Sequence, residues 1–167
     1  MDRRSQTMWV SIAGVVAVGL YAGLAALQLL VLGPLDMVPG LTIDEIRSGV
    51  LASGESMGEA GVIAILGAGV VIGVFLAVVV IRARVRPALA AMGFLVMLML
   101  GAPVLFHSSF IPGMAVADAF AASGGAMTFG LLPFYAISIA SGILLIIGAL
   151  VVARRERAAA TVASVTN

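Results

Sequence analysis

Side chains capable of acid–base chemistry are scarce in the apolar parts of this chain, and two of them lie near each other in the sequence. His107 is the only histidine, Ser108 and Ser109 follow it, and Asp118 stands in a stretch of Ala, Val and Phe. A histidine within hydrogen-bond reach of a carboxylate forms an acid–base pair, and a lone histidine can sense pH. We favour the other interpretation, in which His107 lies at a membrane boundary and is solvated by water or lipid headgroups, and Asp118 caps a helix or points to water.

Gln28 is the most polar side chain well inside the first apolar block, about one helical turn from its outer end. A buried carboxamide can line a ligand pocket, but a hydrogen bond between packed helices, worth on the order of 0.6 kcal/mol, is commoner. Gln28, His107 and Asp118 are therefore the candidate ligand-binding residues, and no residue is assigned a catalytic role.

Metal and cofactor sites are disfavoured by the residue types available. The chain has no cysteine, which excludes disulfides, thiolate ligands and cysteine nucleophiles, and a single histidine does not make a zinc or haem site. Thioethers can bind copper(I), but without His or Cys beside them they are typical of adaptable packing. The methionines concerned are Met57, Met92, Met97, Met99, Met114 and Met127. We expect no cofactor and no metal.

The elements that position these residues are predicted to be transmembrane helices. Of the 167 residues 62% are hydrophobic and 10% are charged, so the chain carries more apolar surface than a soluble core of this size can bury. Four apolar windows, at 8–32, 60–81, 87–106 and 131–153, are each long enough to cross roughly 30 Å of hydrocarbon. The alternating polarity of a β-barrel is absent. The sequence predicts an all-α membrane protein: one domain, with four transmembrane helices in an antiparallel bundle.

Arginine predicts the orientation of this bundle. Eight of the nine basic residues lie at one end of the predicted helices, namely Arg3, Arg4, Arg82, Arg84, Arg86, Arg154, Arg155 and Arg157. The positive-inside rule makes that end cytoplasmic, so both termini, the basic link 82–86 and the polar tail 154–167 are inside. The loops 33–59 and 107–130 are then outside.

The arginines also indicate where the protein is located and which partners it needs. Anionic lipid headgroups account for the basic flanks, so no nucleic-acid partner is needed. Arginine without any lysine, in a chain rich in Ala, Val, Gly and Leu, is typical of a GC-rich bacterial genome. We therefore expect a multi-pass protein of the bacterial plasma membrane, the cell inner membrane.

The first outer loop is predicted to be a structured cover. Thr42 and Glu45 fit a capping box, which predicts a helix of about two turns from Ile43. A second capping box, from Ser56 to Glu59, is predicted to start the second transmembrane helix. We expect the short helix to lie flat across the outer mouth of the bundle.

The second outer loop is apolar but too short to cross the membrane. Residues 114–122 predict a short interfacial or re-entrant helix, which Ser123, Gly124 and Gly125 end. Short helices in both outer loops are therefore expected to pack together as a cap. Pro103 is expected to bend or loosen the outer end of the third transmembrane helix.

Small residues at four-residue spacing predict the faces on which the helices pack, because association in lipid depends on close approach of the backbones. These helix-packing positions are Gly19, Gly23, Gly69, Gly73, Ala77, Ser138 and Gly142. Packing within the bundle is the commoner use of such spacings, and a seam between two copies of the chain is the alternative.

The function is predicted less sharply than the fold, because no motif is a catalytic or cofactor signature. No ionisable side chain stands near the middle of a predicted span, which disfavours stand-alone ion-coupled transport. The best hypothesis is a non-enzymatic accessory or regulatory subunit of a membrane complex, held by the lipid bilayer and by a membrane-protein partner or a homo-oligomer.

Two alternatives remain open. The first is a protein that binds or permeates a lipid or small apolar molecule beneath the outer cap, near Gln28, Pro103 and His107. The second is a membrane enzyme that acts at the outer interface through His107 and Asp118.

Overall fold

The computed structural model describes residues 2–122 and 129–165. Within these residues every regular element is helical, and none is a strand. The described part of the chain contains four helical stretches long and apolar enough to cross a membrane, which confirms the four apolar helices predicted from the sequence. These stretches are Arg3–Met37, Glu59–Arg82, Pro87–Phe120 and Phe129–Arg154.

The first stretch is built from three elements: α1 (Arg3–Leu27), the π-helical turn η1 (Gln28–Leu32) and α2 (Gly33–Met37). A short helix, α3 (Ile43–Ala52), connects it to α4 (Glu59–Arg82). A tight link leads to α5 (Pro87–Phe120), and the 3₁₀ turn η2 (Phe129–Leu131) precedes α6 (Leu132–Val165).

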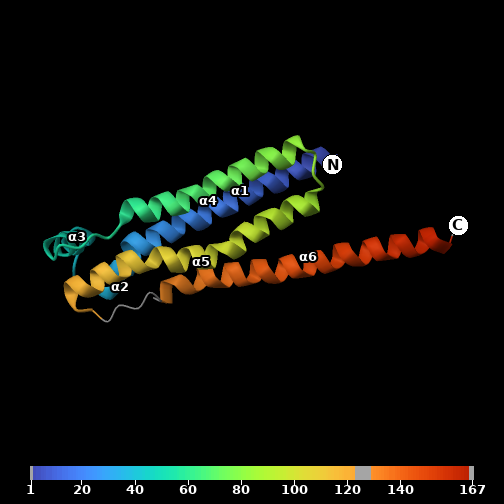
Figure 1. Cartoon of the computed structure of the whole chain (residues 1–167). Coiled ribbons are helices and arrows are strands. Elements are labelled where there is room, and N and C mark those ends of the chain that lie inside the picture. Colours follow the sequence, from blue (N-terminus) through green and yellow to red (C-terminus); the bar gives the residue numbers. More distant parts are fainter. Residues whose placement is uncertain (1, 123–128, 166–167) are drawn as a thin grey trace.

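The helices form a layered bundle (Figure 1) in which α1 lies side by side with α4 and α5, and α6 packs mainly on α5. The start of α1, the α4–α5 link and the end of α6 lie at one end, which we call the link end. The opposite end, with α2, α3 and η2, is the cap end. Only 11% of the most apolar window of the last stretch is buried, against 33% in the first, so α6 is the least enclosed spanning helix.

The fifth helix is longer than the sequence predicted. A helix end near Phe106 and a separate helix over 114–122 were expected, and this is wrong, because one helix runs from Pro87 to Phe120. Pro103 and Pro112 lie inside it, and each removes one backbone hydrogen bond. Figure 1 shows α5 changing direction along its length, as expected for a helix that contains proline.

Packing against α3 explains why α5 continues past its prolines. Ala115 and Val116 are buried in a cluster with Ile46 and Val50 of α3, so the last turns of α5 bury apolar surface that a separate flat helix would leave exposed. α5 ends at Ala121, whose φ of 48° is left-handed. The predicted stop signal, Ser123, Gly124 and Gly125, lies outside the described residues, as does Met127.

Two other helix ends also lie beyond the predicted spans. The first stretch continues past Leu32 to Met37 through the π-turn. At the other terminus, residues 154–165 of the predicted polar tail continue α6 to Val165, which projects past the link end (Figure 1). The reason is that this segment is rich in Ala and Arg and has no glycine or proline to stop the helix.

The first capping box is confirmed. The Thr42 N–H donates to Glu45 Oε2 at 2.7 Å, and the Glu45 N–H donates to Thr42 Oγ1 at 3.3 Å. The second predicted box is wrong: α4 begins after Gly58, which is left-handed and whose N–H bonds Ser56 Oγ at 3.2 Å. The Glu59 carboxylate pairs instead with Arg47 Nε, at 2.7 Å, and so joins α3 to the start of α4.

Candidate functional site

The Gln28 side chain lies in the bundle at the start of the π-turn and is only 6% exposed. Pro34 follows this turn and has no N–H to donate to the Leu30 carbonyl. The Gly33 N–H bonds the Gln28 carbonyl, five residues back, which makes the turn π-helical. The Gln28 carboxamide packs directly on Gly130 of η2, where a side chain would not fit. Its Nε2 atom is buried and has no hydrogen-bond partner among the residues that the structure describes.

A seven-residue register between α1 and α5 leads from Gln28 to a second buried polar side chain. Both helices run from the link end to the cap end, and Gly14 packs against Phe94 while Tyr21 packs against Gly101. One further step of seven residues along each helix leads to Gln28 on α1 and to Ser108 on α5. Ser108 is 3% exposed, and its Oγ is also buried, with no hydrogen-bond partner in the described part of the chain. Sequence reasoning grouped Ser108 with the exposed His107 and missed its burial.

Tyr21 joins three helices through its hydroxyl group. The Tyr21 hydroxyl lies 3.3 Å from Ser138 Oγ, and Ser138 Oγ donates to the Leu98 carbonyl at 2.8 Å. The Tyr21 ring meets the ring of Phe134 edge to face, with centroids 5.4 Å apart. Sequence reasoning did not single out Tyr21; the available signal was a lone tyrosine deep in an apolar helix, whose hydroxyl needs a partner.

His107 and Asp118, the two candidates for acid–base chemistry, are not brought together. His107 and Asp118 are exposed on α5, whereas Gln28 is buried. Because α5 is one continuous helix, the eleven-residue step from His107 to Asp118 corresponds to about 16 Å along its axis. That separation is too long for an acid–base pair, so we do not propose an enzyme that uses these two side chains.

The methionines of α5 pack onto glycines of the neighbouring helices. Met97 contacts the position of Gly73, Met99 that of Gly142, and Met92 that of Gly148. The thioethers therefore point to different helices rather than to one centre. The described residues also contain no group of three His, Asp or Glu side chains that could hold a metal ion.

The predicted packing positions fall into two sets. Gly73, Ala77, Ser138 and Gly142 lie at helix contacts within the bundle. At Gly19, Gly23 and Gly69, by contrast, an added Cβ would find no atom within 4 Å. The neighbours Leu20 and Leu24 on α1 are 60% and 54% exposed. We call Gly19 and Gly23 the open glycine pair, because the fold does not use them for its own packing.

Gly69 lines an apolar groove between α1, α4 and α5. The groove has a volume of about 260 Å³, and Tyr21 and Gly101 are among its lining residues. Ile65, Ile72 and Met97 also line it. It lies along the middle of the helices rather than at Gln28, Pro103 and His107, where a binding site was predicted, and both Pro103 and His107 are exposed.

The electrostatics at the cap end hold α3 in place. Hydrogen bonds from the Thr42 N–H and, second, from the Thr42 hydroxyl lower the pKa of the Glu45 carboxyl below its ordinary value. Arg47 pairs with Glu59 and lies 3.7 Å from Asp44. These groups are exposed or half-exposed, so they position the helix and contribute little to global stability.

Comparison of the chain with models of protein families, with curated proteins and with solved structures finds no match. Function is therefore inferred from the residues and their geometry. Two features that could bind a partner or a ligand are the open glycine pair on α1 and the apolar groove at Gly69.

Proposed function

We propose that this chain is a non-enzymatic accessory or regulatory subunit of a membrane complex and that the open glycine pair of α1 docks a transmembrane helix of its partner. The link end faces the cytoplasm in this proposal, with both termini inside, because the arginines gather there. The membrane is a bacterial plasma membrane, which the arginine-only basic composition favours.

The open glycine pair carries this proposal. Gly19 and Gly23 are four residues apart, the spacing that lets two helix backbones approach closely in lipid. Packing inside the bundle was the competing explanation for these residues, but apart from the adjoining turns of α1 itself no described atom lies within 4 Å of a Cβ at either one. Glycine inside a helix is destabilising by about 1 kcal/mol per residue relative to alanine. At Gly19 and Gly23 no packing contact within this fold offsets that destabilisation.

The test is co-purification in nanodiscs or mild detergent, followed by native mass spectrometry. The wild-type chain is expected to carry a second polypeptide at fixed stoichiometry, and the double variant Gly19→Leu, Gly23→Leu is expected to lose it. The matched control is Gly61→Leu, Gly67→Leu, since both of these α4 glycines are also open but do not share the four-residue spacing.

Three results would overturn or redirect the proposal. A wild-type chain that purifies alone and monomeric would contradict it. Equal loss of partner in the test and control variants would show that the open glycine pair is not the docking face. A homo-oligomer that only the test variant disrupts would keep the face but replace the accessory role with self-association.

The apolar groove favours a second candidate function, the binding of a lipid chain or a small apolar molecule. Its walls come from three helices, and Gly69 leaves part of it open because glycine has no side chain. Gly69→Leu is expected to fill the groove and abolish photo-crosslinking by a lipid with a diazirine in its acyl chain. Gly67→Leu should leave the crosslinking unchanged, and equal labelling of both variants would exclude a specific site there.

A further inference from the structure

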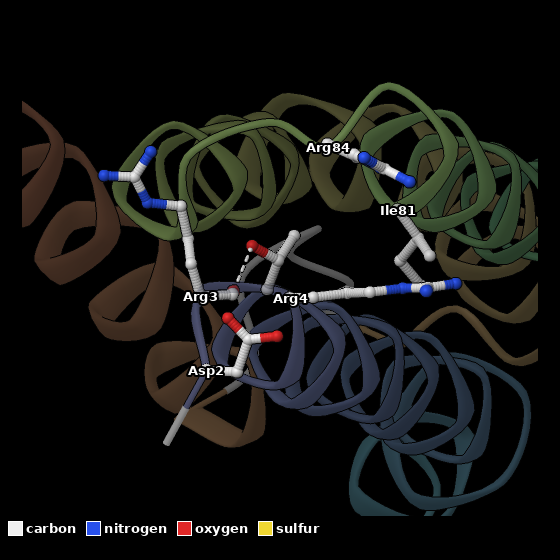
Figure 2. Close-up of a pocket in the computed structure, with 6 residues that line it drawn as sticks. Asp2, Arg3, Arg4, Ile81 and Arg84 are labelled. Atoms are coloured by element: carbon white, nitrogen blue, oxygen red, sulfur yellow. Dashed lines mark hydrogen bonds between the residues drawn. The ribbon is translucent and has the colours of Figure 1, made fainter.

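A basic pocket lies at the link end, between the start of α1 and the end of α4. It has a volume of about 360 Å³ and is lined by Asp2, Arg3, Arg4, Thr7, Ile81 and Arg84. Three arginines and one aspartate are therefore among its lining residues. Figure 2 shows Arg4 and Arg84 pointing the same way on either side of Ile81, while Arg3 points away from them.

The backbone brings these arginines together. Thr7 Oγ1 donates to the Val85 carbonyl at 3.0 Å, so the first turns of α1 are held against the α4–α5 link. The link is tight because α4 ends with two hydrogen bonds that reverse the chain: the Arg84 N–H bonds the Ile81 carbonyl, and the Val85 N–H bonds the Val80 carbonyl.

Arg84 occupies a position that usually belongs to glycine. Its φ is 52°, in the left-handed region that a helix-terminating residue of this kind adopts. A non-glycine residue there is strained, and this chain has 20 glycines at other positions. The turn that strains the Arg84 backbone also places the Arg84 side chain at the pocket, which favours a role for this side chain there.

The positive charges at the pocket exceed the negative charge there, since three arginines and one aspartate line it. Among the side chains that the structure describes (residues 2–122, 129–154 and 157), no carboxylate lies within ion-pair distance of Arg3, Arg4 or Arg84. Like charges gathered around one cavity repel, and an anion inserted between them removes that repulsion. Guanidinium groups bind phosphate oxygens in pairs of parallel hydrogen bonds, so phosphate is the anion that they suit best.

The level of the pocket favours a phosphate that belongs to a lipid. It lies where the apolar parts of α1 and α4 end, and Trp9, which is 56% exposed, stands on α1 close to that level. Exposed tryptophan is typical of the boundary between hydrocarbon and headgroups. The phosphate group of a lipid already lies at this boundary, so it does not have to be transferred there from bulk water.

We propose that Arg4 and Arg84 bind the phosphate group of an anionic phospholipid in the leaflet at the link end, with Arg3 raising the local positive potential. This site is independent of the partner-docking function proposed for α1. It differs from general attraction between basic residues and a membrane, because it assigns binding to two particular arginines of the link end.

The test is retention of lipid by the full chain, measured by native mass spectrometry with phosphatidylglycerol or phosphatidylcholine added at equal concentration. The wild-type chain is expected to prefer phosphatidylglycerol, and Arg4→Gln with Arg84→Gln should weaken that retention by roughly thirtyfold. The matched control removes the same charge elsewhere at this end, as Arg86→Gln with Arg154→Gln, and should change retention by less than about threefold. Equal losses in both pairs would overturn the site in favour of diffuse electrostatics.

Two further measurements keep the result interpretable. Arg84→Gly is expected to raise the thermal midpoint of unfolding, because glycine relieves the left-handed strain, and yet to reduce retention of phosphatidylglycerol. A loss of binding in this variant therefore does not reflect unfolding. In the second measurement, inorganic phosphate at millimolar concentration competes with the lipid. Binding of inorganic phosphate that depends on Arg4 and Arg84, without any preference for anionic lipid, would overturn the lipid as the source of the phosphate.

Discussion

The Tyr21 hydroxyl lies 3.3 Å from Ser138 Oγ, and the single hydroxyl proton of Ser138 is already donated to the Leu98 carbonyl at 2.8 Å. Tyr21 is therefore the donor to Ser138. This chain of two hydrogen bonds connects α1, α6 and α5, and it is the polar link that holds the weakly enclosed α6 to α1.

The first prediction concerns this link. Tyr21→Phe and Ser138→Ala should each lower the free energy of unfolding by roughly 0.5–1.5 kcal/mol, as measured by denaturant titration in mixed micelles. Combined, they should be less than additive, since both remove the same bond. Tyr135→Phe is the control and should be neutral or slightly stabilising, because the Tyr135 hydroxyl is buried and bonds to none of the described residues. Full additivity of the first two changes would exclude the Tyr21–Ser138 bond.

The second prediction contrasts two glycines of α5. A Cβ at Gly101 would lie 2.7 Å from Cζ of Tyr21, whose ring is held by Ser138 and Phe134, so Gly101→Ala should lower stability by about 1–3 kcal/mol. Gly113 has open space at the same atom, so Gly113→Ala should raise stability by up to about 1 kcal/mol through helix propensity. Thermal unfolding in detergent measures both. The same sign for the two variants would contradict the packing described.

The third prediction concerns the unpartnered Gln28 Nε2. Replacement of a buried, unbonded polar group by an apolar side chain of similar shape should not destabilise the fold, so Gln28→Met should be neutral or stabilising in the same titration. Gly130→Ala provides the steric comparison and should be destabilising, because its methyl group would enter the Gln28 carboxamide. If Gln28→Met lowered stability by more than about 1.5 kcal/mol, the Nε2 atom would have a partner, such as a bound water or ligand.

The fourth prediction is the pH dependence of α3. The Glu45 pKa is lowered in the folded state by its hydrogen bonds to Thr42, so its contribution is complete above its ordinary value of 4.5 and is lost as the pH falls through the folded pKa. Amide protection in α3, measured by hydrogen exchange and corrected for intrinsic rates, should be constant near neutrality and fall only at pH values below 4.5. Glu45→Gln should remove this acid transition while Asp44→Asn retains it. A transition that survives in Glu45→Gln would belong to another carboxylate.

The helices and the capping box of α3 were predictable because their signals are local. A transmembrane helix requires only a long apolar run, since every backbone group is bonded within the segment. The capping box of Thr42 and Glu45 is likewise decided by residues three apart in the sequence. The second box failed because the same local pattern, Ser56 to Glu59, had a stronger competitor: Glu59 forms an ion pair with Arg47 of α3, twelve residues away.

The candidate site was much less predictable, because burial on a helix in lipid has little periodic signal. Nearly every face of these helices is apolar, so the sequence does not show which face meets lipid and which meets protein. His107 and Ser108 are neighbours in the sequence, yet the first is exposed and the second is buried. The same limit applies to the small-residue pairs, since Gly19 and Gly73 look alike in sequence although only Gly73 packs within the bundle.

The sequence by itself determined that this chain forms four long apolar helices, because hydrophobicity and length decide which segments can span a bilayer. Only the tertiary structure decided how those helices use their faces. It continued α5 through two prolines by packing its last turns on α3, left Gly19 and Gly23 unpacked, and placed Arg4 beside Arg84. The physical reason is that spanning is a property of each segment alone, whereas burial depends on contacts between residues far apart in the chain.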